Sequence, residues 1–185
     1  MASHIYICPV GPVDEAILVH VAERVTTLSG IACKISSGTE NPEYAYDRTR
    51  DQYNGKLILK HLSEAYRPDT LGIMGITNID MYVPILKYVY GLAQLEGRCA
   101  VISLQRLRPQ FYDQQPDRSL LLTRAEKTAS HELGHSFGLT HCRNRRCVMY
   151  PSTRIEDTDR KQQDFCPTCL ALFQWYLEKD PDTPH

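Results

Sequence analysis

Three histidines at fixed spacing limit the fold of this 185-residue chain more than any other feature. His131 and His135 are four positions apart, so a helix would present both imidazoles on one face, one turn apart. Gly138 can end that helix in the left-handed conformation and bend the chain back, so that His141 faces the same point. Three imidazoles that leave a fourth position open are typical of a catalytic zinc site. The spacing therefore predicts a helix that carries two zinc ligands and a turn that supplies the third.

Glu132 directly follows the first histidine and can reach a zinc-bound water without being a ligand itself. In such a site the metal lowers the pKa of the water and polarises a carbonyl, while the carboxylate carries the proton to the leaving amine. The alternative is a solvated helix face with ordinary histidines, but a chain with 7 histidines rarely produces the complete pattern by chance. We therefore expect Glu132 to act as the general base in the hydrolysis of peptide bonds.

Four of the cysteines form two short pairs in the last third of the chain. Four residues separate Cys142 from Cys147, and two separate Cys166 from Cys169, which is the spacing of closed zinc sites. Four thiolates leave no open position, so this second ion is expected to be structural. Free buried thiols and disulfides are the alternatives. The two motifs together predict two zinc ions per chain, one catalytic and one structural.

Basic side chains accompany these cysteines: Arg143, Arg145, Arg146, Arg154, Arg160 and Lys161. A zinc ion bound by four thiolates has a net negative charge, so charge compensation explains the basic stretch, and a nucleic-acid surface is the alternative. The whole chain has 21 basic and 22 acidic residues and a formal net charge of −1, which does not favour a nucleic-acid partner. We therefore expect a peptide or protein substrate and no nucleic acid.

The histidine motif resembles that of the metzincin clan of zinc peptidases, whose pattern His-Glu-x-x-His-x-x-Gly-x-x-His is complete here. The four cysteines and Met149 make the chain similar to the archaemetzincin family. The resemblance implies a twisted mixed sheet with a backing helix and an active-site helix, and a small C-terminal lobe below a horizontal cleft. It also implies that Met149 packs beneath the catalytic zinc as a support. Some metzincins place a tyrosine two positions after this methionine to bind the metal or stabilise the oxyanion, so the resemblance makes Tyr150 a weaker candidate, since it lies only one position after Met149.

Hydrophobic patterning before the motif predicts an α/β layer. A first helix capped by Asp14 and ended by Gly30, a helix over about 48–66, and a helix from the Thr123–Glu126 capping box to about Phe137 are expected. The expected strands are His4–Cys8, Ile31–Ile35, Leu71–Thr77 and Cys99–Leu104, and a last helix covers about 166–178. The segment 82–92, interrupted by proline and glycine, is expected at the edge of the sheet, where the resemblance places an extended antiparallel peptide.

The length suits a single catalytic domain over 1–185, with an N-terminal subdomain over 1–138 and a C-terminal subdomain over 139–185. The start of the chain lacks a basic segment followed by an apolar one, and no later stretch is apolar enough for a membrane span. The odd number of cysteines, 7, favours a reducing compartment with a metal over disulfides, so the chain is expected to be cytoplasmic. It is also expected to be monomeric and not bound to a membrane. The rival hypothesis is a non-catalytic zinc-binding module that acts through protein or nucleic-acid partners.

Overall fold

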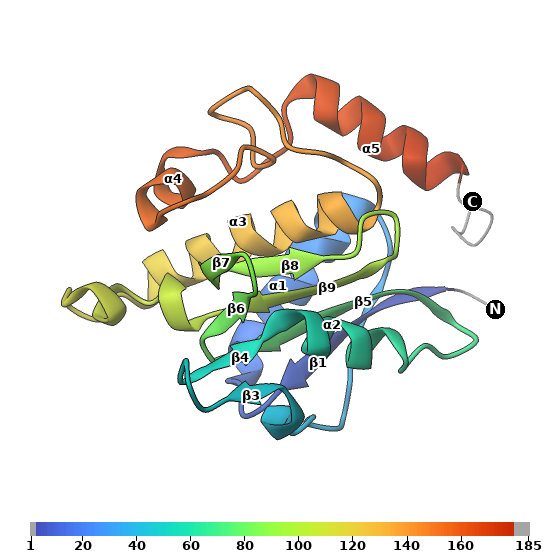
Figure 1. Cartoon of the computed structure of the whole chain (residues 1–185). Helices are drawn as coiled ribbons and strands as arrows, with labels where there is room; N and C mark the ends of the chain where they lie inside the picture. Colours follow the sequence, from blue (N-terminus) through green and yellow to red (C-terminus); the bar gives the residue numbers. More distant parts are fainter. Residues whose placement is uncertain (1–2, 180–185) are drawn as a thin grey trace.

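The computed structural model describes residues 3–179, and its strands in that range form two sheets. Three central strands of the larger sheet are parallel, and the edge strand β8 is antiparallel to β9 (Figure 1). In spatial order the larger sheet contains β2 (Cys33–Ile35), β1 (His4–Val10), β5 (Thr70–Thr77), β9 (Cys99–Ser103) and β8 (Gly91–Ala93). The smaller sheet contains β3 (Tyr46–Asp47), β4 (Gln52–Asn54), β6 (Met81–Val83) and β7 (Leu86–Val89). The expected mixed sheet is confirmed.

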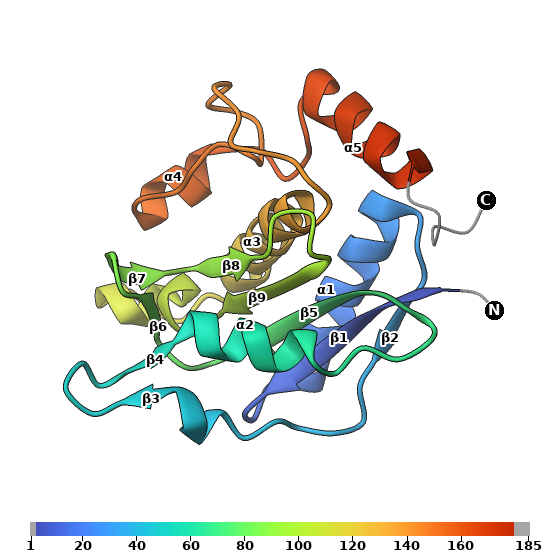
Figure 2. The same cartoon turned by 45° about the vertical axis from the view of Figure 1, so that its right-hand side comes forward.

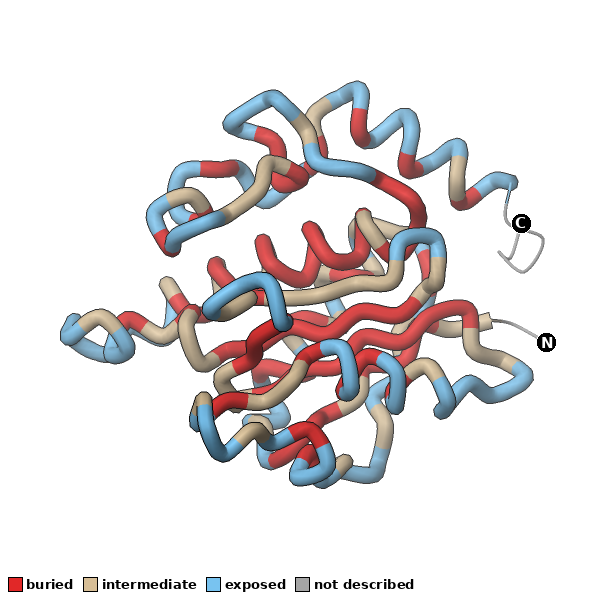
Figure 3. Tube along the Cα trace, in the orientation of Figure 1, coloured by how far each residue is buried: buried red, intermediate tan, exposed pale blue. Residues whose placement is uncertain are grey.

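Helices cover both faces of the larger sheet. The helices are α1 (Glu15–Ser29), α2 (Gly55–Ser63) and α3 (Arg118–Ser136). On β1, Ile5 and Ile7 enter the core shared with α1 and α3, whereas Tyr6 enters the core shared with α2. The alternation continues on β9, where Ile102 belongs to the first core and Val101 to the second. Figure 2 shows α2 on one side of the sheet and α1 on the other, and Figure 3 shows the central strands and α3 as buried.

The predicted limits of the first helix are confirmed. The Asp14 side chain accepts a hydrogen bond from Ala16 N at 3.0 Å, and Gly30 ends the helix with a φ of 73°. Glycine adopts this left-handed conformation without the steric penalty of a side chain. Helix α1 therefore backs the sheet at the position that the sequence predicts.

Two other helix starts were predicted wrongly. Helix α3 begins at Arg118, because the Asp117 carboxylate accepts a hydrogen bond from Leu120 N at 2.9 Å, and Thr123 lies inside the helix. Helix α2 begins at Gly55, where Asn54 provides the cap, and the preceding residues form the short strands β3 and β4. In both helices the residue directly before the first helical residue, Asp117 or Asn54, accepts a hydrogen bond from an amide of the first turn and so forms the cap.

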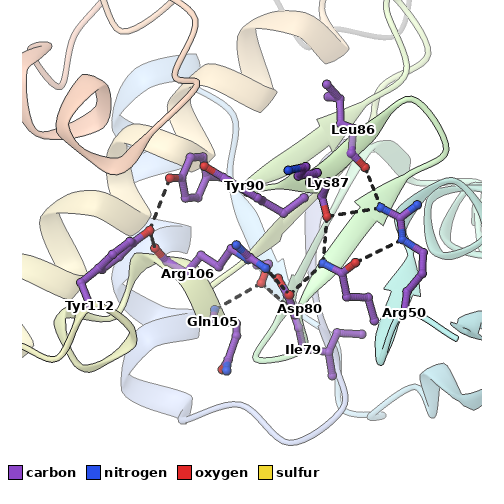
Figure 4. Close-up of polar contacts among 12 residues, drawn as sticks. Arg50, Ile79, Asp80, Leu86, Lys87, Tyr90, Gln105, Arg106 and Tyr112 are labelled. Carbon is purple, nitrogen blue, oxygen red and sulfur yellow. Dashed lines mark hydrogen bonds and ion pairs between the residues drawn. The ribbon is translucent and has the colours of Figure 1, made fainter. Parts of the chain in front are cut away.

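A polar network fixes the hairpin of β6 and β7, which leads into the edge strand β8 (Figure 4). Arg106 donates two hydrogen bonds to the carboxylate of Asp80, at 2.6 and 2.7 Å. Gln52 donates both to Asp80 and to the Lys87 carbonyl, and Arg50 donates to the carbonyl of Leu86. The two charge-assisted bonds between Arg106 and Asp80 are directional, so the network fixes the position of the hairpin that precedes β8. Strands β7 and β8 are edges of their sheets, as expected for part of the segment 82–92.

The chain after α3 lies on the side of α3 opposite the larger sheet and contains α4 (Ile155–Arg160) and α5 (Pro167–Lys179) (Figure 1). Helix α4 is not among the helices expected from the sequence. Arg124 of α3 forms two 2.8 Å hydrogen bonds to Asp159, and Lys127 donates to the carbonyls of Thr158 and Asp159 at 3.0 Å. These contacts hold α4 against α3. Among residues 3–179, no helix is long and apolar enough to cross a membrane.

Candidate metal centre

The three histidines of the motif converge on one point. His131 and His135 lie on α3, and Gly138 follows with a φ of 104°, which turns the chain so that His141 approaches both. One ring nitrogen from each histidine lies within 4.8 Å of the other two. Their ring centroids are 4.6, 4.9 and 5.3 Å apart. The arrangement could hold a metal ion with three nitrogen ligands.

Backbone carbonyls orient two of these rings. His131 Nδ1 lies 2.8 Å from the Val148 oxygen, and His135 Nδ1 lies 2.7 Å from the Leu139 oxygen. Because a carbonyl oxygen only accepts, each Nδ1 carries the proton and each Nε2 keeps a lone pair. The two Nε2 atoms are 3.1 Å apart, so their lone pairs repel unless a cation lies between them. Zinc bonds of about 2.0–2.1 Å to each nitrogen are compatible with that separation.

The surroundings keep the imidazoles neutral, as metal ligation requires. Burial, followed by the positive charge of Lys161, holds the pKa of His131 well below its usual value. Burial also lowers the pKa of His135 and of His141. The donor set therefore fits zinc in its chemistry as well as in its spacing.

Glu132 directly follows His131 on α3 and is buried, with 7% of its surface exposed. Burial raises its pKa to about 8, against the opposing effect of the Lys161 ammonium. A side chain at Gly91 would meet Glu132, since a Cβ there would lie 2.6 Å from both Cγ and Oε1 of the glutamate. Strand β8 thus approaches the carboxylate through a residue without a side chain. In the sequence, Gly91 indicates only an edge strand.

Met149 packs against Gly134, on the helix turn that bears the histidines, and its role as a support beneath the zinc stays a prediction. It is fully buried, and a Cβ at Gly134 would lie 2.5 Å from its sulfur, so only glycine at that position of α3 admits this packing. The Met149 carbonyl accepts a hydrogen bond from Cys142 N at 3.0 Å. This hydrogen bond therefore connects the turn that contains Met149 to Cys142, the residue that follows His141.

Tyr150 contributes to the site through its main chain. Its carbonyl accepts a hydrogen bond from Lys161 Nζ at 3.0 Å, and its amide donates to Cys147. A role of the Tyr150 hydroxyl stays a prediction. From the sequence, Lys161 is expected among the basic residues that offset the cysteines, but the structure buries it beside His131. No local sequence pattern predicts the contact between Lys161 and His131. Lys161 follows the short polar helix α4, which is distant from His131 in the chain.

The four cysteines of the two pairs also converge. Their sulfurs lie within 4.8 Å of one another, and Cys142 and Cys166 are 3.9 Å apart. This is close to the separation of about 3.8 Å that follows from tetrahedral bonds of about 2.3 Å, and far longer than a disulfide bond. Asn144 N and Cys166 N donate to the sulfurs of Cys142 and Cys147, at 3.4 and 3.3 Å. The donors fit a closed site with four sulfur ligands.

Residues 16–175 match the model of peptidase family M54. The chain is 42% identical over 174 residues to an archaemetzincin of Methanocaldococcus jannaschii, with 94% of each chain covered. It is 41% identical over 180 residues to an archaemetzincin of Pyrococcus furiosus, again with 94% of each covered. The crystal structure of an archaemetzincin from Methanopyrus kandleri superposes with a TM-score of 0.84 at 33% identity, covering 96% of this chain and 97% of that chain. A zinc-dependent peptidase from Methanocorpusculum labreanum superposes with a TM-score of 0.82 at 27% identity, covering 91% of this chain and 99% of that chain.

The fold, the three-histidine site and these likenesses define the class of the protein as a zinc metallopeptidase. Within that class, the chain belongs to peptidase family M54, and the relatives that it matches are archaemetzincins.

Proposed function

We propose that the chain hydrolyses peptide bonds at a metzincin-type centre built from His131, His135 and His141, with Glu132 as the general base. The observation that carries the proposal is the convergence of three imidazole nitrogens within 4.8 Å, with the buried carboxylate of Glu132 next in the chain to His131. An ordinary solvated helix face would not bury its histidine and glutamate together. The substrate is a peptide or protein.

The roles of the chain's own residues follow from their placement. The three imidazoles would hold zinc, which when bound lowers the pKa of a water molecule and polarises the carbonyl of the scissile bond. The carboxylate of Glu132 would accept a proton from the attacking water and pass it to the nitrogen of the leaving amine. The carbonyls of Val148 and Leu139 keep the ligand rings oriented by accepting their Nδ1 protons.

The edge strand β8 supports the docking of an extended peptide next to Glu132. Tyr90 O accepts from Ser103 N, and Gln94 N donates to Cys99 O, so these residues bond toward β9. In an antiparallel ladder the intervening residues alternate, which directs the peptide groups of Gly91 and Ala93 away from β9. A peptide that pairs with this edge would pass beside the carboxylate that faces Gly91.

The cysteine cluster acts as a structural zinc site in a C-terminal subdomain over 139–185 that is attached to an N-terminal subdomain over 1–138. Its donors close the coordination sphere and tie the loop that bears Cys142 and Cys147 to the start of α5. The loaded protein therefore carries two zinc ions. A monomeric and cytoplasmic state without a nucleic-acid partner stays a prediction.

Stepwise chelation tests the proposed function. Four thiolates bind zinc more firmly than three neutral imidazoles with an open position. The loaded protein should contain two zinc ions per chain, and mild chelation should remove one, together with peptidase activity, while circular dichroism stays unchanged. Loss of both ions at the same chelator strength, or a single ion in a fully loaded sample, would contradict the proposal.

Replacing Gly91 should impair catalysis more than stability. The Cβ of Gly91→Ala would displace the Glu132 side chain, which is flexible enough to move without unfolding the protein. Because a displacement of about 1 Å can cost about a hundredfold in rate, we expect kcat to fall by at least about tenfold, with little change in Tm. Gly55→Ala is the control, since its Cβ would make only ordinary contacts of 3.5 Å or longer. Parental kcat in Gly91→Ala would contradict the placement of Glu132.

A further inference from the structure

Lys161 occupies a position that no zinc-binding motif explains. It directly follows α4, its side chain is only 3% exposed, and its Nζ atom lies 3.5 Å from Nδ1 of His131. The same Nζ donates a 3.0 Å hydrogen bond to the carbonyl of Tyr150. Burial of an ammonium group is costly unless the group is well partnered, so this placement needs a compensating role.

The lysine and the first ligand histidine contact the same turn of the chain. His131 donates its Nδ1 proton to the carbonyl of Val148, and Lys161 donates to the carbonyl of Tyr150, two residues further on. Met149 lies between these carbonyls and packs against Gly134 of α3. The turn is therefore held from α3 on one side and from Lys161 on the other.

Rigid elements set the distance between Lys161 and His131. The contacts of Arg124 and Lys127 with the end of α4 hold that helix against α3, which itself carries His131. Lys161 is the C-cap residue of α4, and its amide donates to Asp157 O at 3.3 Å. The position of the ammonium is thus fixed relative to the histidine ring.

We propose that Lys161 is a positioning residue of the histidine site, which holds the 148–150 turn so that the Val148 carbonyl keeps the His131 ring aimed at the metal. The inference rests on the proposed function, because it assigns metal binding to His131. Lys161 acts through the turn and does not touch the metal. Removing its ammonium leaves the Tyr150 carbonyl without its donor and frees the turn that orients the first ligand.

The test is metal affinity at the histidine site in Lys161→Met, which has nearly the same length but no donor. Loss of a residue that orients a ligand commonly weakens metal binding by about 10–100-fold, so we expect at least about tenfold weaker binding of Zn²⁺ and Co²⁺ at this site. The visible spectrum of Co²⁺ at the histidines should also change. The zinc of the cysteine site should be retained and serve as an internal measure of folding. Lys161→Arg, which keeps a cationic donor, should recover most of the affinity.

Lys127→Met is the matched control. It also removes a buried lysine that donates to two carbonyls of the C-terminal segment, but one that does not contact the 148–150 turn. This variant should lower Tm, and because Lys161 still donates to Tyr150 and Arg124 still holds α4, it should weaken metal binding at the histidines far less than Lys161→Met does. Parental affinity and spectrum in Lys161→Met would overturn the positioning role, as would equal losses in Lys127→Met. A parent protein that binds no metal at the histidines would overturn the proposed function itself.

Discussion

Glu132→Gln should lose peptide hydrolysis while both metal sites remain loaded. Glutamine has nearly the same size but cannot accept the proton from the attacking water, and general-base catalysis contributes about 10²–10⁴-fold to the rate. We expect kcat to fall by at least about a hundredfold. Zinc content should stay at the parental value, because the carboxylate is not a ligand. Measurement of hydrolysis of a peptide that the parent cleaves, together with metal analysis, gives the result.

Glu126→Gln provides the control on the same helix. Glu126 contacts His20 and Gln163 on the part of α3 that faces α1, and it takes no part in the proposed chemistry. Its replacement should leave kcat at the parental value. If Glu132→Gln cleaves the peptide as fast as the Glu126 control, Glu132 is not the base.

Cys166→Ser combined with Cys169→Ser should weaken metal binding at the histidines, although neither cysteine belongs to that site. The two replacements remove half of the sulfur donors. Without the zinc ion at the cysteines, the loop that bears Cys142 is no longer connected to α5. Because His141 directly precedes Cys142, its position relative to the other two histidines is then less well fixed. We expect zinc affinity at the histidines to fall by more than about tenfold, which corresponds to about 1.4 kcal/mol. Competition with a chelator of known affinity would measure this.

The coupling should be asymmetric. His131→Ala leaves all four sulfurs in place, so the zinc at the cysteines should be retained at parental strength. Cys33→Ser controls for the loss of a cysteine as such, because Cys33 lies on β2, outside both clusters. A double cysteine variant that binds zinc at the histidines as strongly as the Cys33 control would refute the coupling.

Local spacing made much of the site predictable. The four-residue separation of His131 and His135 determines their common face on any helix, and Gly138 permits the left-handed turn that brings His141 back. The cysteine pairs are likewise local, but their convergence required that the loop and α5 meet. Caps were predictable only where one candidate existed, as at Asp14. At α3, Asp117 formed the cap although the Thr123–Glu126 pattern was also present.

The sequence by itself thus determined which residues can bind metal, because helix geometry and glycine conformation act over a few residues. The tertiary structure decided what surrounds them. Gly91 meets Glu132 only because β8 packs across α3, and Lys161 meets His131 only because α4 docks on the same helix. Such contacts depend on the packing of elements that lie 30 or more residues apart in the chain. Hydrophobic periodicity predicts which face of an element is buried, but it does not predict which side chains of two packed elements will be in contact.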